Sequence, residues 1–295
     1  MTSKHESQKY LGLELAGAKN QKTAIAVIEH FPKGNKTFLL DIYDRLPSGD
    51  PALLELISEI QDDSEISRIG VNVPLELPPC MTCTKKSCLG PKSCPQHCEV
   101  ESVKWMREIT ARAARKEGVR AHEFTPYTQR PVELWIRYEV LPKLPLTHRF
   151  EIDEALGGNK APLTARMHFL KRHLRDLHLS EAWPKLTMAI LAQQLGISKR
   201  IISRYRHLEE GMQAREEIIA TLVEEHRIFI YERDVRKLSH SLAAFDAFMC
   251  SYTALLCDLE KCAEIPDDYP TDAGWVEYPS LEMDNSDLWA SPEKR

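Results

Sequence analysis

The sequence predicts an α/β protein in which a mixed five-stranded sheet is flanked by helices. Three apolar runs follow one another within the first 46 residues, which is typical of strands joined by short turns. A helical segment and another buried apolar run come next, and a strand reached through a helix crossover is usually parallel to its neighbour. The second half of the chain is dominated by apolar positions at helical spacing.

The first four strands are expected from their apolar runs and from the turn-forming segments AKNQ and PKGN between them. Short connections favour an antiparallel meander of the first three strands. Pro51 indicates the start of a helix that ends near Asp63, and Pro74 ends the strand that follows it. The expected strands are Tyr10–Gly17, Lys22–Phe31, Lys36–Leu46 and Ile69–Val73.

The fifth strand is expected at Gly118–Pro126, after a helix at Glu101–Glu117. From Leu163 the apolar residues recur by four and three as far as Leu177, which predicts an amphipathic helix with its basic residues mostly off the apolar stripe. The other expected helices are Pro131–Val140, Thr187–Leu195, Lys199–Leu208, Gln213–Glu225 and Ser239–Leu259.

Composition and charge restrict the class of protein. With 43% hydrophobic and 28% charged residues the chain is typical of a globular protein. The polar start MTSKHESQKY lacks the apolar run of a signal peptide, and no apolar stretch is long enough to cross a bilayer, so we expect a cytoplasmic protein with reduced thiols. Between Lys160 and Arg206 there are ten Lys and Arg against two acids, within a chain of net charge −5. Such a basic block inside an acidic protein indicates a polyanionic partner more than uniform basicity would, and a solvated helix face is the more common origin of a single charge run.

Two acids stand in apolar surroundings where a carboxylate is costly unless it is paired or binds a cation. Glu14 lies in the first apolar run, and Asp246 lies in the helical segment HSLAAFDAFMCSYTALL. Acids held on rigid elements at one sheet edge can bind divalent metal ions for phosphodiester chemistry. An ion pair for Glu14 and an ordinary helix position for Asp246 are the simpler alternatives.

A series of segments resembles the successive motifs of one widespread bacterial and archaeal family, the domain-of-unknown-function family four-two-nine, whose members are regarded as predicted RNase H-like nucleases. The resemblance runs from about Tyr10 to Pro279. It implies an RNase H-like fold and cleavage of nucleic acid with Mg²⁺ or Mn²⁺. The segments are YLGLELAGAKNQKTAIAVIE, GVNVPLELP, TPYTQRPVELWIR, GGNKAPLTARMHFLK, FDAFMCSYTALL and GWVEYP.

The resemblance implies a set of catalytic positions, which this chain fills only in part. Glu14 falls where the family usually has Asp, and Asp246 matches the final acid. Asn72 falls where a carboxylate normally lies, which lowers the expected metal affinity because an amide offers an oxygen but no charge. Glu133, beside Arg130, matches a position that could supply a further carboxylate. Arg130, Lys160 and Arg166 are expected to position phosphates.

Five of the eight cysteines lie in a Cys-rich insert at residues 79–99. The spacings CxxC and CxxxC, in a segment rich in Pro and Gly, favour a structural Zn²⁺ bound by four thiolate or imidazole ligands. An iron–sulfur cluster is the second choice, and unliganded thiols are the third. The six candidate ligands are Cys80, Cys83, Cys88, Cys94, His97 and Cys98. The remaining Cys250, Cys257 and Cys262 are expected to be core residues.

The segment Thr187–Leu208 is similar to a DNA-reading helix-turn-helix. Ala192 would face inward, Gly196 would form the turn and Ser198 would cap the second helix. Any short helix–Gly–helix corner gives the same pattern, so we expect contact with nucleic acid here and no reading of base sequence. The exposed basic residues of the second helix would be Lys199, Arg200 and Arg204.

These observations lead to one domain plan and three functional hypotheses. We predict the first part of the core at 8–160, a basic helical insertion at 161–222, the rest of the core at 223–281 and a loose acidic tail at 282–295. The leading hypothesis is a divalent-metal-dependent nuclease acting on DNA or RNA. A nucleic-acid-binding protein with a decayed catalytic site is the second, supported by Asn72, and a helix-turn-helix regulator is the third.

Overall fold

The computed structural model describes residues 7–17, 23–44, 46, 49–63, 65–88, 97–118, 123–207, 209–225 and 228–282. The chain forms two compact units. The first unit consists of Met1–Asn72, Leu170–Ala263 and Glu277–Arg295, and the second consists of Val73–Phe169 and Glu264–Val276. Cys94 and most of the predicted acidic tail lie outside the described residues.

The first unit contains a mixed five-stranded sheet of order β3-β2-β1-β4-β5, which confirms the predicted α/β class. β2 is antiparallel to both β1 and β3, whereas β4 is parallel to β1 and β5 is parallel to β4. The predicted meander and the parallel strand after a helix crossover are therefore correct. The strands are β1 (Gln8–Glu14), β2 (Ala24–Phe31), β3 (Lys36–Tyr43), β4 (Ile66–Val71) and β5 (Leu179–Glu181).

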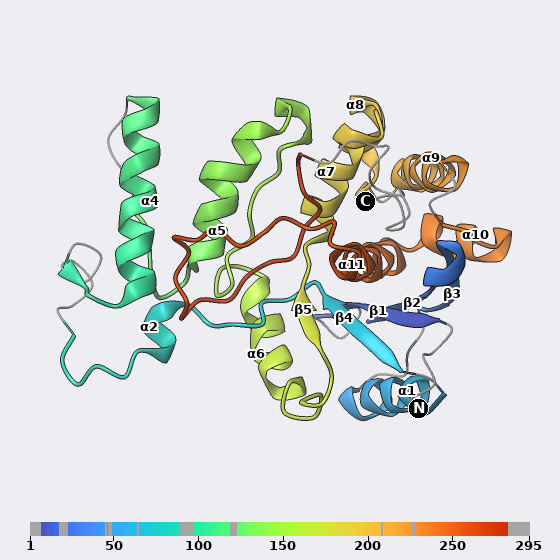
Figure 1. The fold of residues 1–295 in the computed structure, drawn as a ribbon, viewed down its shortest axis with the longest axis horizontal. Helices are drawn as coiled ribbons and strands as arrows, with labels where there is room; N and C mark the ends of the chain where they lie inside the picture. The colour runs from blue at the N-terminus through green and yellow to red at the C-terminus, as the bar shows by residue number, and fades with distance from the viewer. Residues whose placement is uncertain are drawn as a thin grey trace. The chain divides into compact units, whose positions relative to one another are not determined.

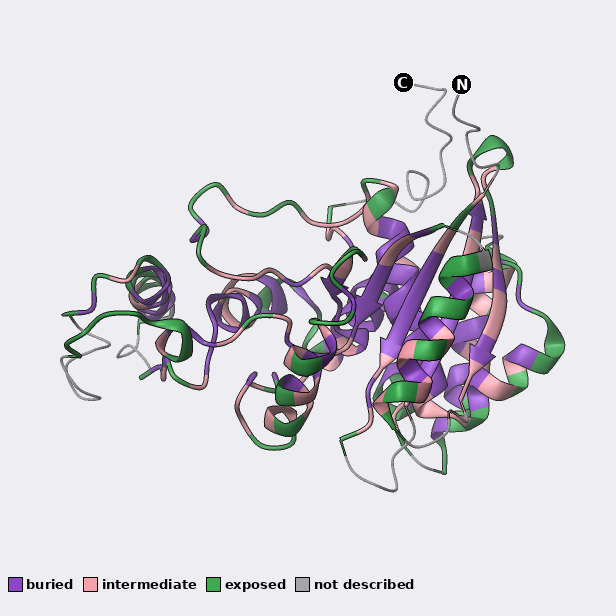
Figure 2. Ribbon diagram, turned by 90° about the horizontal axis from the view of Figure 1, so that it is seen from below, coloured by how far each residue is buried: buried purple, intermediate pink, exposed green. Residues whose placement is uncertain are grey.

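Helices cover both faces of this sheet (Figure 1). α1 (Asp50–Asp63) packs on one face through Leu53, Ile57 and Ile60, whose spacing of four and three places them on one side of the helix. Figure 2 shows that the opposite side of α1 is exposed while the central strands are buried. α11 (Leu242–Asp258) lies on the other face, over β1, β2 and β4.

Two glycines allow α11 to lie unusually close to the sheet. Gly12 of β1 and Gly70 of β4 are paired across the parallel strands. A Cβ atom on Gly12 would lie 1.8 Å from the carbonyl oxygen of Ala247, and one on Gly70 would lie 2.3 Å from that of Cys250. Both distances are shorter than van der Waals contact, so no larger residue fits at either position without moving the helix.

The remaining helices of the first unit lie on the α11 side and enclose an apolar core that includes Phe245, Phe248 and Tyr252. The expected helix at Ser239–Leu259 is divided between two helices, because Ser241 is extended and separates them. The Ser241 hydroxyl oxygen accepts a hydrogen bond from the N–H of Ala244 and so caps the start of α11. The other helices are α7 (Pro184–Gln194), α8 (Lys199–Arg204), α9 (Gly211–Glu224) and α10 (Glu232–His240).

The second unit is built from helices and loops around an aromatic cluster. Trp105, Trp135, Tyr269 and Trp275 contact one another with ring centroids 4.9–6.4 Å apart. Its helices are α2 (Pro79–Thr82), α4 (Glu101–Glu117), α5 (Pro131–Trp135), which continues as a π-helix over Ile136–Val140, and all but the last residue of α6 (Lys160–Leu170).

The position of the fifth strand was predicted wrongly. Gly118 has a left-handed backbone (φ 69°) and donates its N–H to the carbonyl of Ala114, so it ends α4 and begins no strand. Residues 123–126, the other described part of the expected strand, have no strand structure. The fifth strand is instead the short β5. It is held beside β4 by a hydrogen bond from the N–H of Ile69 to the carbonyl of His178, the residue before β5, at 2.8 Å.

Among the described residues, no helix is long and apolar enough to cross a membrane.

The glycine contact gives a direct test of the packing. We expect Gly12→Ala to lower the free energy of unfolding by at least about 3 kcal/mol, because the added methyl must displace the backbone of α11. Gly34→Ala is the control, since a Cβ atom there meets only the Lys36 side chain at 3.7 Å, and its effect should stay within about 0.5 kcal/mol. Equal effects of both variants in urea unfolding would contradict this account.

Candidate functional site

The candidate site begins where β1 and β4 end side by side. Glu14 is the last residue of β1, and Asn72 directly follows β4 and extends its pairing by donating its N–H to the carbonyl of Leu13 at 3.1 Å. The Asn72 side-chain Nδ2 donates to Glu14 Oε2 at 2.6 Å. An ionised carboxylate can only accept hydrogen bonds, so this contact orients the amide with its nitrogen toward Glu14. The structure thus brings these two predicted residues together.

The two side chains project from the face of the sheet that α11 covers. Side chains alternate between faces along a strand, so residues two apart share a face. Gly12 and Gly70 both face α11, and Glu14 and Asn72 each lie two residues farther along their strands. Because α11 runs from the carboxyl ends of β1 and β4 towards their beginnings, its first turns lie nearest to these residues.

Asp246, the third predicted residue, lies in these first turns and is buried. It directly precedes Ala247, the residue that contacts Gly12. Its Oδ1 accepts a hydrogen bond from Nη1 of Arg206 at 2.9 Å, within an ion pair whose arginine is partly exposed. A buried carboxylate is costly without such a partner, so Arg206 is the group that compensates the burial of Asp246.

Burial and the Asp246 carboxylate shift the pKa values of the two neighbouring groups, Arg206 and Tyr205. Burial lowers the pKa of Arg206, but the facing Asp246 carboxylate and the Tyr205 side chain together more than offset it, so the pKa of Arg206 lies above its ordinary value. Burial, with a contribution from Asp246, raises the pKa of Tyr205 to about 12. At neutral pH the guanidinium is therefore charged and the neighbouring phenol is neutral. Arg206 could not be recognised as the partner of Asp246 from the sequence, because the two residues are 40 positions apart.

Glu133 lies in the second unit, where its carboxylate organises the start of α5. Glu133 is fully buried, and its Oε1 accepts from Arg130 Nε and from the N–H of Ala155, each at 2.9 Å. Its Oε2 accepts from the N–H of Arg130 at 3.0 Å. Pro131 at the first helical position and Glu133 at the third are typical of a helix start, a signal that was present in the sequence.

Of the predicted phosphate-contacting residues, Arg130 is buried and paired with Glu133, and the others fall into two groups. Lys160 and Arg166 lie half-buried on α6. On α8, Lys199 is exposed, but Arg200 pairs with Glu217 at 3.3 Å and Arg204 pairs with Glu210 at 3.2 Å. These acids lie outside the basic segment counted in the sequence, so they reduce the net positive charge that α8 presents.

The helix-turn-helix pattern is only partly matched. Ala192 is buried and Gly196 has a left-handed backbone (φ 65°), as predicted. Ser198 occupies the cap position, but its side chain makes no capping hydrogen bond. α7 is largely buried, and α8 has only six residues. The corner is thus a packed part of the first unit.

The Cys-rich insert lines a cavity of about 400 Å³ in the second unit. Cys98 is buried, whereas Cys83 and Cys88 are exposed. In the described part of the chain, the insert supplies no three ligand atoms that all lie within 4.8 Å of one another. The predicted ligands on the cavity wall are Cys80, Cys83, Cys88, His97 and Cys98.

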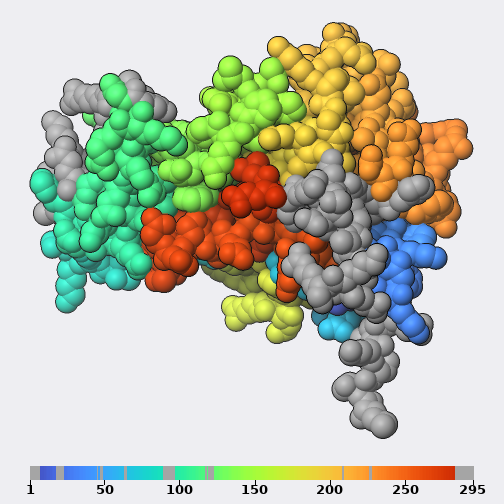
Figure 3. Space-filling model, turned by 45° about the horizontal axis from the view of Figure 1, so that its top comes forward, coloured from blue at the N-terminus to red at the C-terminus, as the bar shows by residue number. Residues whose placement is uncertain are grey.

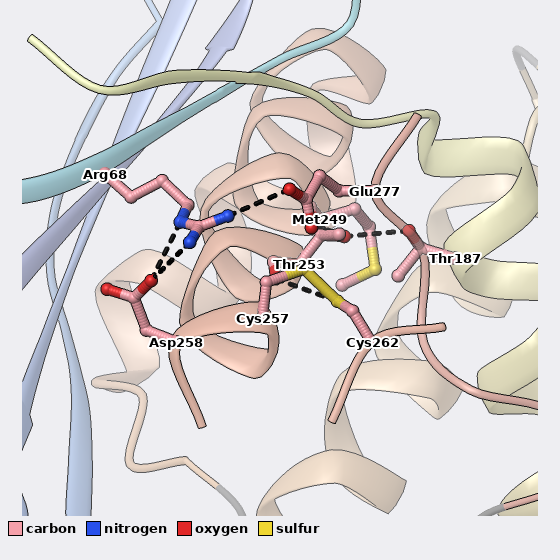
Figure 4. The surroundings of a disulfide bond; sticks show 8 residues. All are labelled: Arg68, Thr187, Met249, Thr253, Cys257, Asp258, Cys262 and Glu277. Carbon is pink, nitrogen blue, oxygen red and sulfur yellow. Dashed lines mark hydrogen bonds and ion pairs between the residues drawn. A yellow bond between two sulfur atoms is a disulfide. The ribbon is translucent and has the colours of Figure 1, made fainter. Parts of the chain in front are cut away.

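Two cysteines of the first unit form a disulfide (Figure 4), so the expectation of reduced core thiols is wrong for them. Cys257 is in the last turn of α11, and Glu260 then takes a left-handed backbone (φ 59°) that turns the chain back and brings Cys262 alongside. Beside the disulfide, Arg68 reaches Asp258 at 2.7 Å and Glu277 at 3.0 Å. Cys250 is a buried core residue, as predicted.

Comparison with known families identifies the relationship of this chain. A family model described as "Protein of unknown function (DUF429)" matches residues 19–271. The chain belongs to the DUF429 family. No curated protein and no solved structure matches it.

The DUF429 match includes most of the candidate site. It spans Asn72, Arg206 and Asp246 and begins after β1, so Glu14 lies outside the matched residues. Glu14 therefore joins the site through its pairing with Asn72. The site of this DUF429 protein offers two carboxylates and one amide, which are oxygen ligands of the kind that Mg²⁺ and Mn²⁺ prefer.

Proposed function

We propose that the protein is a divalent-metal-dependent nuclease of RNase H-like fold that cleaves phosphodiester bonds in DNA or RNA. The observation that carries the proposal is the pair Glu14–Asn72 at the ends of β1 and β4, on the face under the first turns of α11, which carry the buried Asp246. The sheet, with three antiparallel strands followed by two parallel ones, supports the fold that the family resemblance implies.

Glu14 and Asp246 would hold the Mg²⁺ or Mn²⁺, because both offer carboxylate oxygens from rigid elements. When bound, the ion would lower the pKa of a water molecule and stabilise negative charge on the phosphate. Asn72 orients Glu14 through the 2.6 Å hydrogen bond. Arg206 is partly exposed, so its guanidinium can reach a phosphate from its position beside Asp246.

A specific observation also favours the second candidate, a nucleic-acid-binding protein with a decayed catalytic site. Asn72 donates to Glu14 where the family pattern has a carboxylate, and Arg206 neutralises Asp246. Both contacts reduce the negative charge that attracts a divalent cation. The helix-turn-helix regulator has less support, because α8 is short and two of its arginines pair with acids.

For the Cys-rich insert we propose a structural Zn²⁺ that organises the loop. The proposal is supported by the chemistry of the cavity wall, where thiols and one imidazole converge from a segment with little helix or strand. Zinc would draw the thiolates closer together and contribute to the stability of the second unit. An iron–sulfur cluster bound by the thiolates is the alternative to zinc.

We expect Asp246→Asn to reduce cleavage of labelled DNA or RNA by at least about 100-fold, because the variant removes charge where the phosphate is activated. Asp258→Asn is the matched control, since Asp258 lies in the same helix and also pairs with an arginine, Arg68. Wild type and control should cleave alike with Mg²⁺ or Mn²⁺. Cleavage that survives in Asp246→Asn would rule out this assignment, and binding without cleavage by wild type would favour the decayed-site protein.

The purified protein should contain about one zinc per chain by elemental analysis. We expect Cys80→Ser/Cys83→Ser to lose that zinc, because the CxxC pair supplies two of its ligands. Cys250→Ala should retain it, since Cys250 is a core residue of the first unit. Iron content with visible absorption would indicate the cluster instead, and equal zinc in all three proteins would place the metal elsewhere.

A further inference from the structure

The free edge of β3 carries a short segment whose outward side chains are aromatic. The N–H of Phe229 donates to the carbonyl of Thr37, and the carbonyl of Phe229 accepts from the N–H of Leu39, each at 2.9 Å. Ile228 and Ile230 point inward and are buried in the core. Phe229 and Tyr231, at the alternate positions, are 47% and 53% exposed. In an alternating segment the outward positions are usually polar, so two exposed aromatic residues here are informative.

These residues continue an aromatic row that crosses the sheet edge, formed by Phe31, Phe38, Phe229 and Tyr231. Successive ring centroids lie 5.7, 5.8 and 5.0 Å apart. The interplanar angles of 88°, 58° and 88° show that no two neighbours are stacked face to face. Phe229 and Tyr231 are about half-exposed, so their rings can stack with another planar group.

Strand register places this row on the face of the sheet opposite α11. Gly12 faces α11 and is paired with Ala26, so Ala26 and His30 face α11 and Phe31 faces the other way. Phe38 lies opposite Glu29 in the register, and it is bridged to Phe229. In Figure 3 the part of the chain that contains α10 (orange) adjoins the part that contains β3 (blue) on the surface shown.

Cations flank the aromatic row. Lys36 lies directly opposite Phe31 in the register, and Lys33 is in the turn between β2 and β3. Both are exposed, and within the described residues neither forms an ion pair. The Arg233 guanidinium lies 5.8 Å from the Tyr231 ring centroid, and it also pairs with Asp234 at 3.2 Å. Register also places two acids on this face: Glu29, which accepts a hydrogen bond from Ser7 at 2.6 Å, and Asp41, which pairs with Lys237 at 3.6 Å.

From this arrangement we infer that the aromatic row is a stacking surface for single-stranded nucleic acid. The inference rests on the proposed function and names its substrate class. Exposed aromatic side chains at the edge of a sheet can stack on bases irrespective of sequence, and neighbouring Lys and Arg contact the phosphates. Paired bases in a duplex expose no face to such a row, so the surface selects single strands over duplex.

The test is fluorescence anisotropy with labelled 20-nucleotide DNA and RNA strands and a 20-base-pair duplex. We expect Phe229→Leu to weaken single-strand binding roughly 5- to 100-fold, because leucine keeps apolar area and removes the ring face. Phe229→Trp should retain binding. Phe169→Ala is the matched control, since Phe169 is also 47% exposed, and duplex binding should be the same in all variants.

A salt titration gives a second readout. The double variant Lys33→Ala/Lys36→Ala should lower the slope of log affinity against log salt by roughly 1.4, the value for the loss of two phosphate contacts on a single strand.

If Phe229→Leu binds single strands as tightly as wild type does, the stacking surface is overturned and the proposed function stands. Failure of wild type to bind or cleave any nucleic acid would overturn both. If wild type self-associates, and Phe229→Leu abolishes this self-association without changing single-strand binding, the row is a contact between copies. That result would also overturn the inference.

Discussion

The close approach of α11 to β1 and β4 is the constraint on which the rest of the first unit depends. Gly12 and Gly70 are paired beneath the helix and leave no room for a Cβ atom. The helix therefore lies directly on the strands, with its first turns towards the strand ends that carry Glu14 and Asn72. The candidate site depends on this packing, because Glu14 and Asn72 lie at the strand ends and Asp246 lies in the turns of α11 nearest to them.

Packing at this distance also sets the electrostatics of the site. A carboxylate buried at Asp246 needs a cation, and in this structure the cation is Arg206. Under the proposed function, a divalent metal ion would compete with Arg206 for the Asp246 carboxylate. The Asn72–Glu14 hydrogen bond would likewise oppose metal binding at Glu14. The balance between these contacts and a metal ion would then separate the proposed nuclease from a protein that only binds nucleic acid.

Local signals predicted most of the strands and helices, and long-range pairing explains where prediction failed. The meander was readable because its connections are short, whereas β5 has three residues and is a strand only through its pairing with β4. Glu14, Asn72 and Asp246 were found through apolar context and family resemblance. Arg206 was missed because its partner is distant in the sequence. The alternation Ile228–Tyr231 was visible but meant little until the structure placed it at the edge of β3.

A titration of Mn²⁺ by calorimetry tests the central claim, that Glu14 and Asp246 form one cation site in competition with Arg206. The account predicts that wild type binds one ion in this site, that Glu14→Gln loses it, and that Arg206→Gln binds Mn²⁺ more tightly because the competing cation is gone. Identical titrations for wild type, Glu14→Gln and Arg206→Gln would contradict the account, since the ion would then bind elsewhere or not at all.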